Sequence, residues 1–372
     1  MKNIIGLGAL VIAAAMLAGG CAQNKNAGTS SSDTAVQSKS TPTKGTGEKN
    51  RNSAKISVEE KVGQLFMVRC DAQNMDSIME KQPGGIVMFG VDFKDLSKDE
   101  VKKKIKGYKK QSKRPLVIAV DEEGGTVVRV SSNPALSDER FKSPQEYYRE
   151  GGIELVLEKE RKKCNMLKEL GINMNLAPVA DVSTDAEDFI YNRSLGENAE
   201  ETARYVAAVV EEMDENDIAS CLKHFPGYGS NADTHTGIAI DERGRRVFEQ
   251  SDFLPFMKGI DADADAVLVS HNIVTCMDAE NPASISPAVH DVLRNKLDFD
   301  GIIMTDDMSM QAVAEYGEPY IKAVNAGNDM IIVTDFEAAY NEVLNGVKEG
   351  KISEQTINAA FERIMDWKED LE

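Results

Sequence analysis

Positive charge is scarce in this sequence of 372 residues. Lys and Arg together number 43 against 62 Asp and Glu, which gives a formal net charge of −19 at pH 7. A protein that binds nucleic acid needs clustered Lys and Arg to neutralise phosphates. The shortage argues against a nucleic-acid partner, and we interpret the acidity as serving solubility.

Histidine and the common catalytic signatures are scarce as well. The chain has four histidines, and none of them forms an HExxH or HxH motif of the kind that binds zinc. A GxSxG elbow, which would indicate a serine hydrolase, and a GxGxxG dinucleotide fingerprint are also missing. We therefore expect neither a metal site nor an organic cofactor.

Cysteine is infrequent, with five residues in the chain. The four that follow the N-terminal region match no small disulfide scaffold and no zinc motif, and most of them lie in or beside apolar runs. We expect buried free thiols at Cys70, Cys164, Cys221 and Cys276.

The N-terminus reads as an export signal. Residues 1–21 contain a Lys, an apolar run and small residues that end at Cys21. This order resembles a bacterial lipoprotein signal with Cys21 as the lipidated residue, and a plain cleaved signal peptide is the alternative. Residues 22–55 have almost no apolar content and are expected to be a disordered linker. The chain is thus predicted to be exported and held at the outer face of the cell membrane by a lipid anchor.

The rest of the chain, 56–372, repeats a short apolar run followed by a charged segment of helical period. Continuous apolar strands that alternate with helices indicate a parallel sheet covered by helices. Eight such units predict a single α/β domain, a (β/α)8 barrel of the TIM type, whose usual size is roughly 250 residues. A doubly wound open sheet is the alternative. The eight runs are 62–70, 84–90, 115–120, 172–182, 218–225, 264–271, 301–307 and 328–335.

Polar residues gather at the C-terminal ends of these runs. In a (β/α)8 barrel the strand ends meet at one mouth, where the active site lies. A single Asp there is as easily explained as a helix cap, but the whole set predicts one polar pocket. Carboxylates, imidazole and basic groups together suit a polyhydroxylated substrate such as a sugar. The residues are Asp121, Asp181, Lys223, His224, His271, Asp306, Asp307 and Asp335.

Four linked motifs resemble glycoside hydrolase family 3, and within it the bacterial β-N-acetylglucosaminidases. The motifs follow the expected order over 56–372. They are "DEEGGTVVR" (121–129), "NRSLGE" (192–197), "KHFPGYGSNADTH" (223–235) and "GIIMTDDMSM" (301–310).

The resemblance implies catalytic roles for three residues. Asp306 matches the nucleophile, which would form a covalent glycosyl-enzyme intermediate. His235 matches the general acid/base, with Asp233 as its partner; imidazole can give and take a proton near neutral pH, and a carboxylate fixes its tautomer. Asp307 is expected to cap the helix that follows.

The resemblance also implies a set of sugar-binding residues. The chain departs from the usual pattern at Tyr228, where a second His is common, and at Thr126, where a basic residue is often found. Tyr228 can still donate a hydrogen bond, and Thr126 is expected to loosen contacts beyond the terminal sugar. The expected substrate-binding residues are Asp121, Arg129, Arg193, Lys223 and His224.

The resulting hypothesis is an exo-acting, retaining β-N-acetylhexosaminidase, a glycoside hydrolase. It would remove non-reducing terminal GlcNAc from peptidoglycan fragments, as a monomer without metal or cofactor. A β-N-acetylglucosaminide phosphorylase is one alternative, because a histidine acid/base leaves less negative charge to repel phosphate. A non-catalytic glycan-binding surface lipoprotein is the other.

Overall fold

The computed structural model describes residues 56–229, 239–310, 313 and 315–371. Contacts divide the chain into two units, Met1–Arg51 and Asn52–Glu372, and every described residue belongs to the second. The predicted signal peptide 1–21, with Cys21, and the predicted linker 22–55 lie outside the described residues and stay predictions. In the described part of the chain, no helix is both long enough and apolar enough to cross a membrane.

Each of the eight predicted apolar runs contains a strand. The strands are shorter than the runs, because the ends of each run continue into turns at the two rims of the sheet. They are β1 (Phe66–Arg69), β2 (Gly85–Met88), β3 (Val117–Val120), β4 (Met174–Asn175), β5 (Cys221–Phe225), β7 (Ala266–Val269), β9 (Ile302–Thr305) and β10 (Ile331–Val333).

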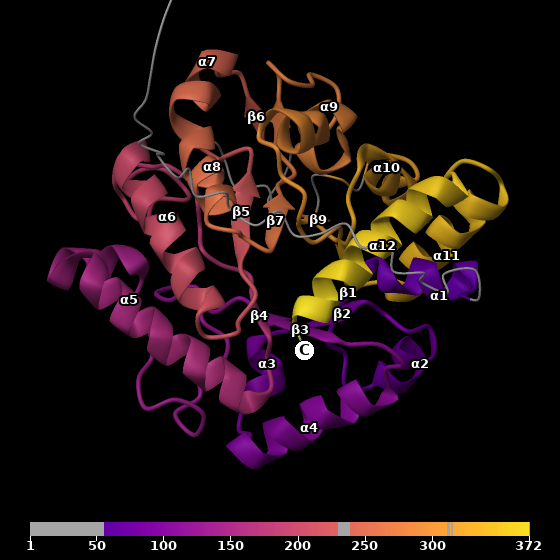
Figure 1. Cartoon of the computed structure of the whole chain (residues 1–372), viewed down its shortest axis with the longest axis horizontal. Helices are drawn as coiled ribbons and strands as arrows, with labels where there is room; N and C mark the ends of the chain where they lie inside the picture. The colour runs from indigo at the N-terminus through magenta and orange to yellow at the C-terminus, as the bar shows by residue number, and fades with distance from the viewer. Residues whose placement is uncertain (1–55, 230–238, 311–312, 314, 372) are drawn as a thin grey trace, which may run out of the picture. The chain divides into compact units, whose positions relative to one another are not determined.

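These eight strands close into a parallel barrel (Figure 1). Five of them pair in the order β10-β1-β2-β3-β4, and the other three pair in the order β5-β7-β9. Single parallel bridges join the two groups: Met174 and Val179 pair with residues of the β5 segment, and Met304 pairs with Met330 beside β10. Every strand therefore has two neighbours, which confirms the (β/α)8 fold and excludes the open sheet.

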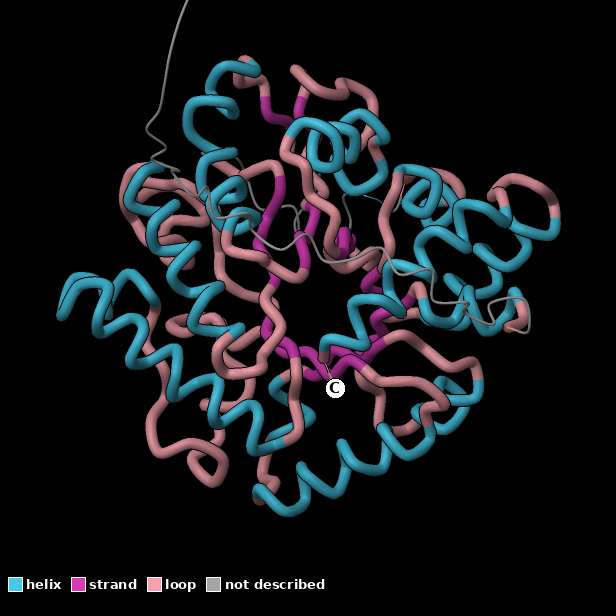
Figure 2. Tube along the Cα trace, in the orientation of Figure 1, coloured by secondary structure: helices cyan, strands magenta, loops and turns pink. Residues whose placement is uncertain are grey.

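Helices follow most strands and pack on the outside of the barrel. Figure 2 shows the ring of strands with helices around it. The helices are α1 (Val58–Gln64), α2 (Met75–Glu80), α3 (Gly90–Phe93), α4 (Lys98–Gln111), α5 (Pro144–Leu170), α6 (Ala199–Asp214), α7 (Arg245–Val247), α8 (Phe253–Asp261), α9 (Pro287–Asp291), α10 (Pro319–Ala326), α11 (Phe336–Lys348) and α12 (Glu354–Asp370), with short turns η2 (Phe248–Asp252), η3 (Ala283–Ile285) and η4 (Val292–Lys296).

Local sequence explains where the longest helix begins and ends. The Ser143 side chain accepts from the backbone N–H of Glu146, the Glu146 carboxylate accepts in return, and Pro144 occupies the first turn of α5. The helix ends at Gly171, whose φ of 89° places it in the left-handed region that glycine tolerates. Between these two caps α5 is kinked at Gly151 and Gly152, whose φ and ψ angles are not helical.

The strands are buried on both faces. All residues of β2, β3, β5, β7, β9 and β10 are buried, as expected for parallel strands between a filled interior and a helical layer. The four predicted thiols are free, with Cys70, Cys164 and Cys221 buried and Cys276 half-buried. The short strands β6 (Ile240–Asp241) and β8 (Ile273–Val274) pair with each other beyond the C-terminal ends of β5 and β7.

Candidate active site

A cavity opens at the C-terminal ends of the barrel strands. Its volume is about 310 Å³, and its lining comes from the ends of β2, β3, β5 and β9 and the loops behind them. Seven of the residues predicted from sequence lie in this one cavity. They are Asp121, Arg129, Arg193, Lys223, His224, Asp306 and Asp307.

Lys223 stands at the centre of an ion cluster. Its Nζ lies 2.8 Å from Asp121 Oδ1 and 2.6 Å from Glu123 Oε1, and its side chain is 2% exposed. Burial alone would lower the pKa of Lys223, but the carboxylates of Asp121 and Glu123 outweigh it and raise that pKa above its ordinary value. Lys223 is therefore a fixed cation at the cavity wall.

Glu123 is a functional candidate to which the sequence analysis gave no role. Its carboxylate accepts two hydrogen bonds from Arg193, at 2.9 Å from Nε and 2.7 Å from Nη2, in addition to the contact with Lys223. Burial acts to raise the pKa of Glu123, but Lys223 and Arg193 lower it well below the ordinary range. This carboxylate neutralises and positions two cations that face the cavity.

The neighbouring Glu122 binds the backbone of the turn that follows β3 and does not line the cavity, whereas Glu123 does. The buried carboxylate of Glu122 accepts from the backbone N–H groups of Arg129 and Val130, both at 2.7 Å. Gly124 sits between, with φ of 109°, where a Cβ would lie 2.2 Å from the Lys142 carbonyl oxygen. The closed turn brings Arg129 back to the mouth of the barrel.

Arg129 faces Asp121 across the cavity. Its Nη2 lies 3.7 Å from Asp121 Oδ2, and its guanidinium lies 5.6 Å from the centre of the Phe89 ring. The Nε of Arg129 is buried and has no hydrogen-bond partner among the described residues. A buried unsatisfied donor is costly, so this N–H is an exception among the buried polar groups of the described residues.

His224 is oriented by Asp181, a strand-end residue to which the sequence assigned no role. Its Nδ1 lies 2.7 Å from Asp181 Oδ2, and its Nε2 lies 3.1 Å from Arg193 Nη2. Arg193 can only donate, so Nε2 accepts and the proton sits on Nδ1. Both ring nitrogens thus have protein partners, and His224 shapes the wall of the cavity through its ring and its hold on Arg193.

An irregularity in β5 brings Lys223 and His224 to the same cavity. The pairing with β7 shifts between Lys223 and Phe225, so the usual alternation of side chains breaks at His224. Phe225 points outward and packs on Phe253 and Phe256 of α8. Lys223 and His224, which would ordinarily face opposite sides of the strand, therefore both reach the mouth of the barrel.

Asp306 lies at the C-terminal end of β9 and is half-buried. Its backbone N–H donates to the Val269 carbonyl at 2.9 Å, and its Oδ1 accepts from the Asp307 N–H at 2.8 Å. His271 donates from Nε2 to the Asp307 carbonyl at 3.0 Å and so fixes this turn. The Asp307 carboxylate accepts from the Ser309 N–H and from Thr334, and residues 308–310 form a turn. The segment that follows lies partly outside the described residues, so the expected helix cap stays a prediction.

A family model decides the chain's relationship to known proteins. The model of the glycosyl hydrolase family 3 N-terminal domain matches residues 57–367, which is most of the chain. The chain belongs to glycosyl hydrolase family 3. This family's N-terminal domain is a (β/α)8 barrel, in agreement with the strand order described above.

Individual members of family 3 resemble the chain over most of its length. A beta-hexosaminidase of Stenotrophomonas maltophilia strain K279a is 32% identical over 289 residues, which cover 74% of this chain and 83% of that protein. The structure of a β-N-acetylglucosaminidase from Paenibacillus sp. strain FPU-7 matches with a TM-score of 0.78 at 28% identity, over 85% of this chain and 63% of that one. A β-N-acetylhexosaminidase from Beutenbergia cavernae matches with a TM-score of 0.77 at 25% identity, over 85% and 99%. The chain therefore spans less than two thirds of the Paenibacillus protein.

Two predicted catalytic residues of this family 3 chain, Asp233 and His235, lie outside the described residues and stay predictions. The described residues on either side meet at Arg243. Its guanidinium pairs with Asp241 at 2.8 Å and with Asp252 at 3.0 Å, and its Nη2 donates to the Gly227 carbonyl at 3.4 Å. Residues that precede and follow 230–238 are thus tied to one buried cluster.

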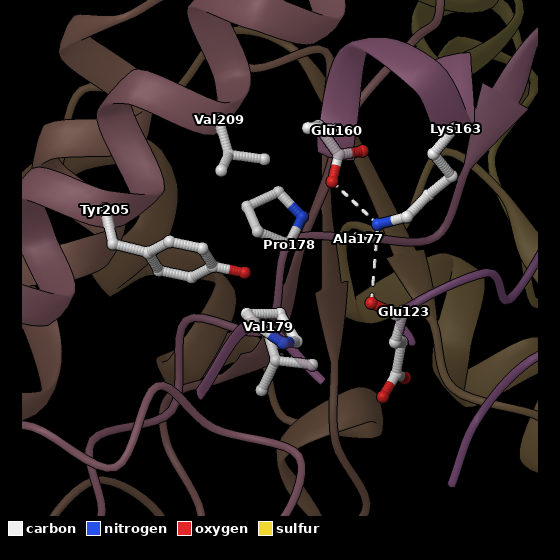
Figure 3. Close-up of a pocket in the computed structure, with 9 residues that line it drawn as sticks. Glu123, Glu160, Lys163, Ala177, Pro178, Val179, Tyr205 and Val209 are labelled. Atoms are coloured by element: carbon white, nitrogen blue, oxygen red, sulfur yellow. Dashed lines mark hydrogen bonds and ion pairs between the residues drawn. The ribbon is translucent and has the colours of Figure 1, made fainter. Parts of the chain in front are cut away.

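Figure 3 shows residues that lie behind the candidate active site. Lys163 of α5 is buried, and its Nζ lies 2.6 Å from Glu160 and 3.3 Å from the backbone carbonyl oxygen of Glu123. The Glu123 carboxylate points away from Lys163 (Figure 3), toward Arg193 and Lys223. Helix α5 therefore holds the backbone of the residue whose side chain organises the cavity.

The described lining of the cavity combines carboxylates with Lys and Arg. In the described part of the chain, no group of three or more His, Cys, Asp and Glu side chains is arranged to hold a metal ion. The cavity instead alternates carboxylates with Lys and Arg, which recognise hydroxyl and amide groups through directed hydrogen bonds.

Proposed function

We propose that this chain is an exo-acting, retaining β-N-acetylhexosaminidase that removes non-reducing terminal GlcNAc. The observation that carries the proposal is the position of Asp306, which shares one cavity with the Asp121, Glu123, Lys223 and Arg193 cluster. A carboxylate at a strand end opposite fixed cations suits attack on a sugar that is held by its hydroxyl groups. The names of the family 3 relatives support the same activity.

The cluster provides a binding surface for a terminal sugar. Asp121 uses Oδ1 for Lys223, while its Oδ2 is 3.7 Å from Arg129 and can accept from a sugar hydroxyl. Lys223 and the guanidinium of Arg129 supply donors. A cavity of about 310 Å³ is closed behind by the barrel, which suits removal of one residue from a chain end.

In the proposed reaction, an Asp306 oxygen attacks the anomeric carbon as the bond from that carbon to the glycosidic oxygen breaks. Asp233 stabilises the protonated imidazole of His235, and His235 gives its proton to the departing oxygen. Water then attacks the same carbon and gives a proton to His235. The bond from that carbon to the Asp306 oxygen breaks, which releases the carboxylate. Two displacements at one carbon retain its configuration.

Kinetics with an aryl β-GlcNAc test the proposal, with an aryl β-glucoside as the comparison substrate. We expect the GlcNAc substrate to be preferred and Asp306→Ala to lower kcat/KM by about ten-thousand-fold. Asp335→Ala is the matched control, because Asp335 ends the neighbouring strand but caps α11 by accepting from the Ala338 N–H. Full activity of Asp306→Ala would contradict the proposed nucleophile.

The same assay addresses the phosphorylase alternative. Added phosphate would raise turnover and yield GlcNAc-1-phosphate if phosphate replaced water in the second step. A hydrolase should release free GlcNAc whether or not phosphate is present. No hydrolysis of the aryl β-GlcNAc by the unmodified chain would instead favour a non-catalytic glycan-binding surface protein.

We also propose that the substrate comes from peptidoglycan and that the chain is lipid-anchored through Cys21. The apolar run, the small residues and the Cys at the end of 1–21 support this anchor. Cell fractionation and mass spectrometry of the mature N-terminus test it. We expect the protein in the membrane fraction with a lipidated Cys21, and Cys21→Ser to abolish lipidation. A soluble mature chain would instead support a plain cleaved signal peptide.

A further inference from the structure

A larger cavity, the basal cavity, opens at the opposite end of the barrel from the candidate active site. Its volume is about 720 Å³. Its lining comes from the end of α4, the segment that leads into β3, the residue before β4 and the end of α12. Because these segments precede the strands, the basal cavity lies at the N-terminal end of the barrel. Its charged lining residues are Lys109, Lys113, Arg114 and Lys368.

Every charged side chain in the described lining of the basal cavity is a cation. Arg114 has a carboxylate partner, since its Nη2 lies 2.8 Å from Glu60. The Nζ of Lys109 donates to the carbonyl oxygen of Gly171 at 2.8 Å. The described residues place no carboxylate within ion-pair distance of Lys109 or Lys113. In a chain of net charge −19, such a cavity favours an anion locally.

Lys368 adds a buried charge to these rim lysines. It is 1% exposed, and its Nζ donates to Gln64 Oε1 at 3.0 Å and to the carbonyl oxygen of Gly84. Both acceptors are neutral, so Lys368 is a buried cation without a carboxylate partner in the described part of the chain. Burial and the nearby charge of Arg114 lower the pKa of Lys368 to about 7. An anion in the basal cavity would favour its charged form.

The carboxylates at this end of the barrel line a different cavity. It has a volume of about 370 Å³, adjoins the basal cavity and shares Lys109 with it. Positive and negative groups are thus segregated into two neighbouring cavities, and an anion is favoured only in the one lined by lysines. The carboxylates of the adjoining cavity are Asp214, Asp217, Asp265 and Asp370.

The kind of cation indicates the kind of anion. Lysine ammonium groups recognise an anion as point charges, which suits phosphate, whereas a carboxylate is matched better by the paired N–H groups of a guanidinium. The guanidinium that lines the basal cavity belongs to Arg114 and is already held by Glu60. A phosphate monoester carries between one and two negative charges near neutral pH, so it can be shared by several ammonium groups.

We propose that the basal cavity binds a phosphate group, either free phosphate or a phosphate monoester of a larger molecule. Lys368 supplies the buried charge, and Lys109 and Lys113 contact the anion from the rim. The site lies at the other end of the barrel from Asp306 and is independent of the proposed hexosaminidase activity. Because the anion would contact both α4 and α12, its binding would stabilise the folded chain.

Calorimetric titration of the full chain with inorganic phosphate, at constant ionic strength, tests the site. We expect saturable binding of one phosphate per chain. The double variant Lys109→Gln and Lys113→Gln should weaken binding about tenfold, because two contacts with the anion are lost. Both side chains are exposed, so this variant should fold. Lys368→Met should also weaken binding about tenfold, since it removes the buried charge.

The matched control is Lys103→Gln. Lys103 is exposed on the same helix, α4, and lines neither the basal cavity nor the adjoining one. This variant loses one positive charge and should keep the phosphate affinity of the unmodified chain within about twofold. Thermal unfolding gives a second readout. Added phosphate should raise the Tm of the unmodified chain and of Lys103→Gln more than that of the double variant.

Titration with glycerol phosphate distinguishes the two sources of the phosphate group. Tighter binding than that of inorganic phosphate assigns the group to a larger molecule, and equal or weaker binding assigns it to the free ion; either result supports the site. The proposal is overturned if the unmodified chain shows no saturable binding of inorganic phosphate. It is also overturned if the double variant binds phosphate as tightly as the unmodified chain, because the bound anion then lies elsewhere.

Discussion

Two fully buried lysines stand at opposite ends of the barrel and differ in their partners. Lys223 at the C-terminal mouth is 2% exposed and contacts the carboxylates of Asp121 and Glu123. Lys368 of α12 is 1% exposed, and its Nζ donates to Gln64 Oε1 at 3.0 Å and to the Gly84 carbonyl, near the starts of β1 and β2. Lys223 lines the candidate active site, and Lys368 joins the last helix to the base of the barrel.

The difference in partners separates their titration. Burial lowers the pKa of Lys368 to about 7, because neutral oxygens do not compensate the lost hydration of an ammonium group. The pKa of Lys223 is raised instead, since two carboxylates overcome the same burial. Burial therefore does not decide whether a lysine is a fixed charge. In this fold the carboxylates lie at the mouth, where a substrate must be held.

Removing the mouth lysine should have the largest effect. Lys223→Met takes away a donor and leaves Asp121 and Glu123 without their shared cation, so we expect kcat/KM on an aryl β-GlcNAc to fall about a thousandfold. Lys368→Met is the matched control, with activity of the folded protein within about twofold of the unmodified chain. Equal losses of kcat/KM from both variants would show that the two lysines differ in their contacts but not in their importance for activity.

Weakening the charge at the mouth should have a smaller effect. Glu123→Gln keeps the shape of the side chain but no longer neutralises Arg193 and Lys223, so we expect kcat/KM to fall about a hundredfold. Glu212→Gln is a matched control, because Glu212 is buried and forms a bidentate pair with Arg161 away from the cavity, at 2.8 and 2.7 Å. Steady-state kinetics of the two variants, each checked by thermal unfolding, would refute the role of Glu123 if their activities matched.

The smallest effect is expected in the pH dependence of stability, which should reveal the lowered pKa of Lys368. Between about pH 7 and the ordinary pKa of 10.5, the unfolded chain keeps a proton on Lys368 that the folded chain has lost. Raising the pH across this window therefore stabilises the fold, by at most about 1.4 kcal/mol per pH unit for one group. Denaturant unfolding at pH 7 to 10 should show the free energy of the unmodified chain rising relative to Lys368→Met. A constant difference would contradict the lowered pKa.

The barrel was predictable from sequence because its strands are buried on both faces. That burial produces continuous apolar runs, which mark all eight strands irrespective of their partners. The run 172–182 shows the limit, since it yields a strand only at Met174–Asn175. Pro178 has no N–H for a sheet, and Asp181 turns in to hold His224 and the Tyr228 backbone.

The site was less predictable, because its contacts join distant segments. Adjacent glutamates in "EEGG" look alike in sequence, yet Glu122 binds the backbone of its own turn while Glu123 reaches Arg193 and Lys223. His224 is a predicted sugar-binding residue, and only the structure reveals that its two ring nitrogens contact Asp181 and Arg193. Such assignments depend on which side chains meet in space, which a single sequence does not record.

The contact between Lys163 and the Glu123 carbonyl has a consequence for engineering this enzyme. A search for altered specificity that varies only the residues around the cavity would leave helix α5 untouched, although α5 anchors the backbone from which the central carboxylate projects. Substitutions at Glu160 or Lys163 would move that anchor without touching a sugar. The outer helix is therefore a place from which selection could retune the chemistry of the mouth while every residue in contact with the substrate stays the same.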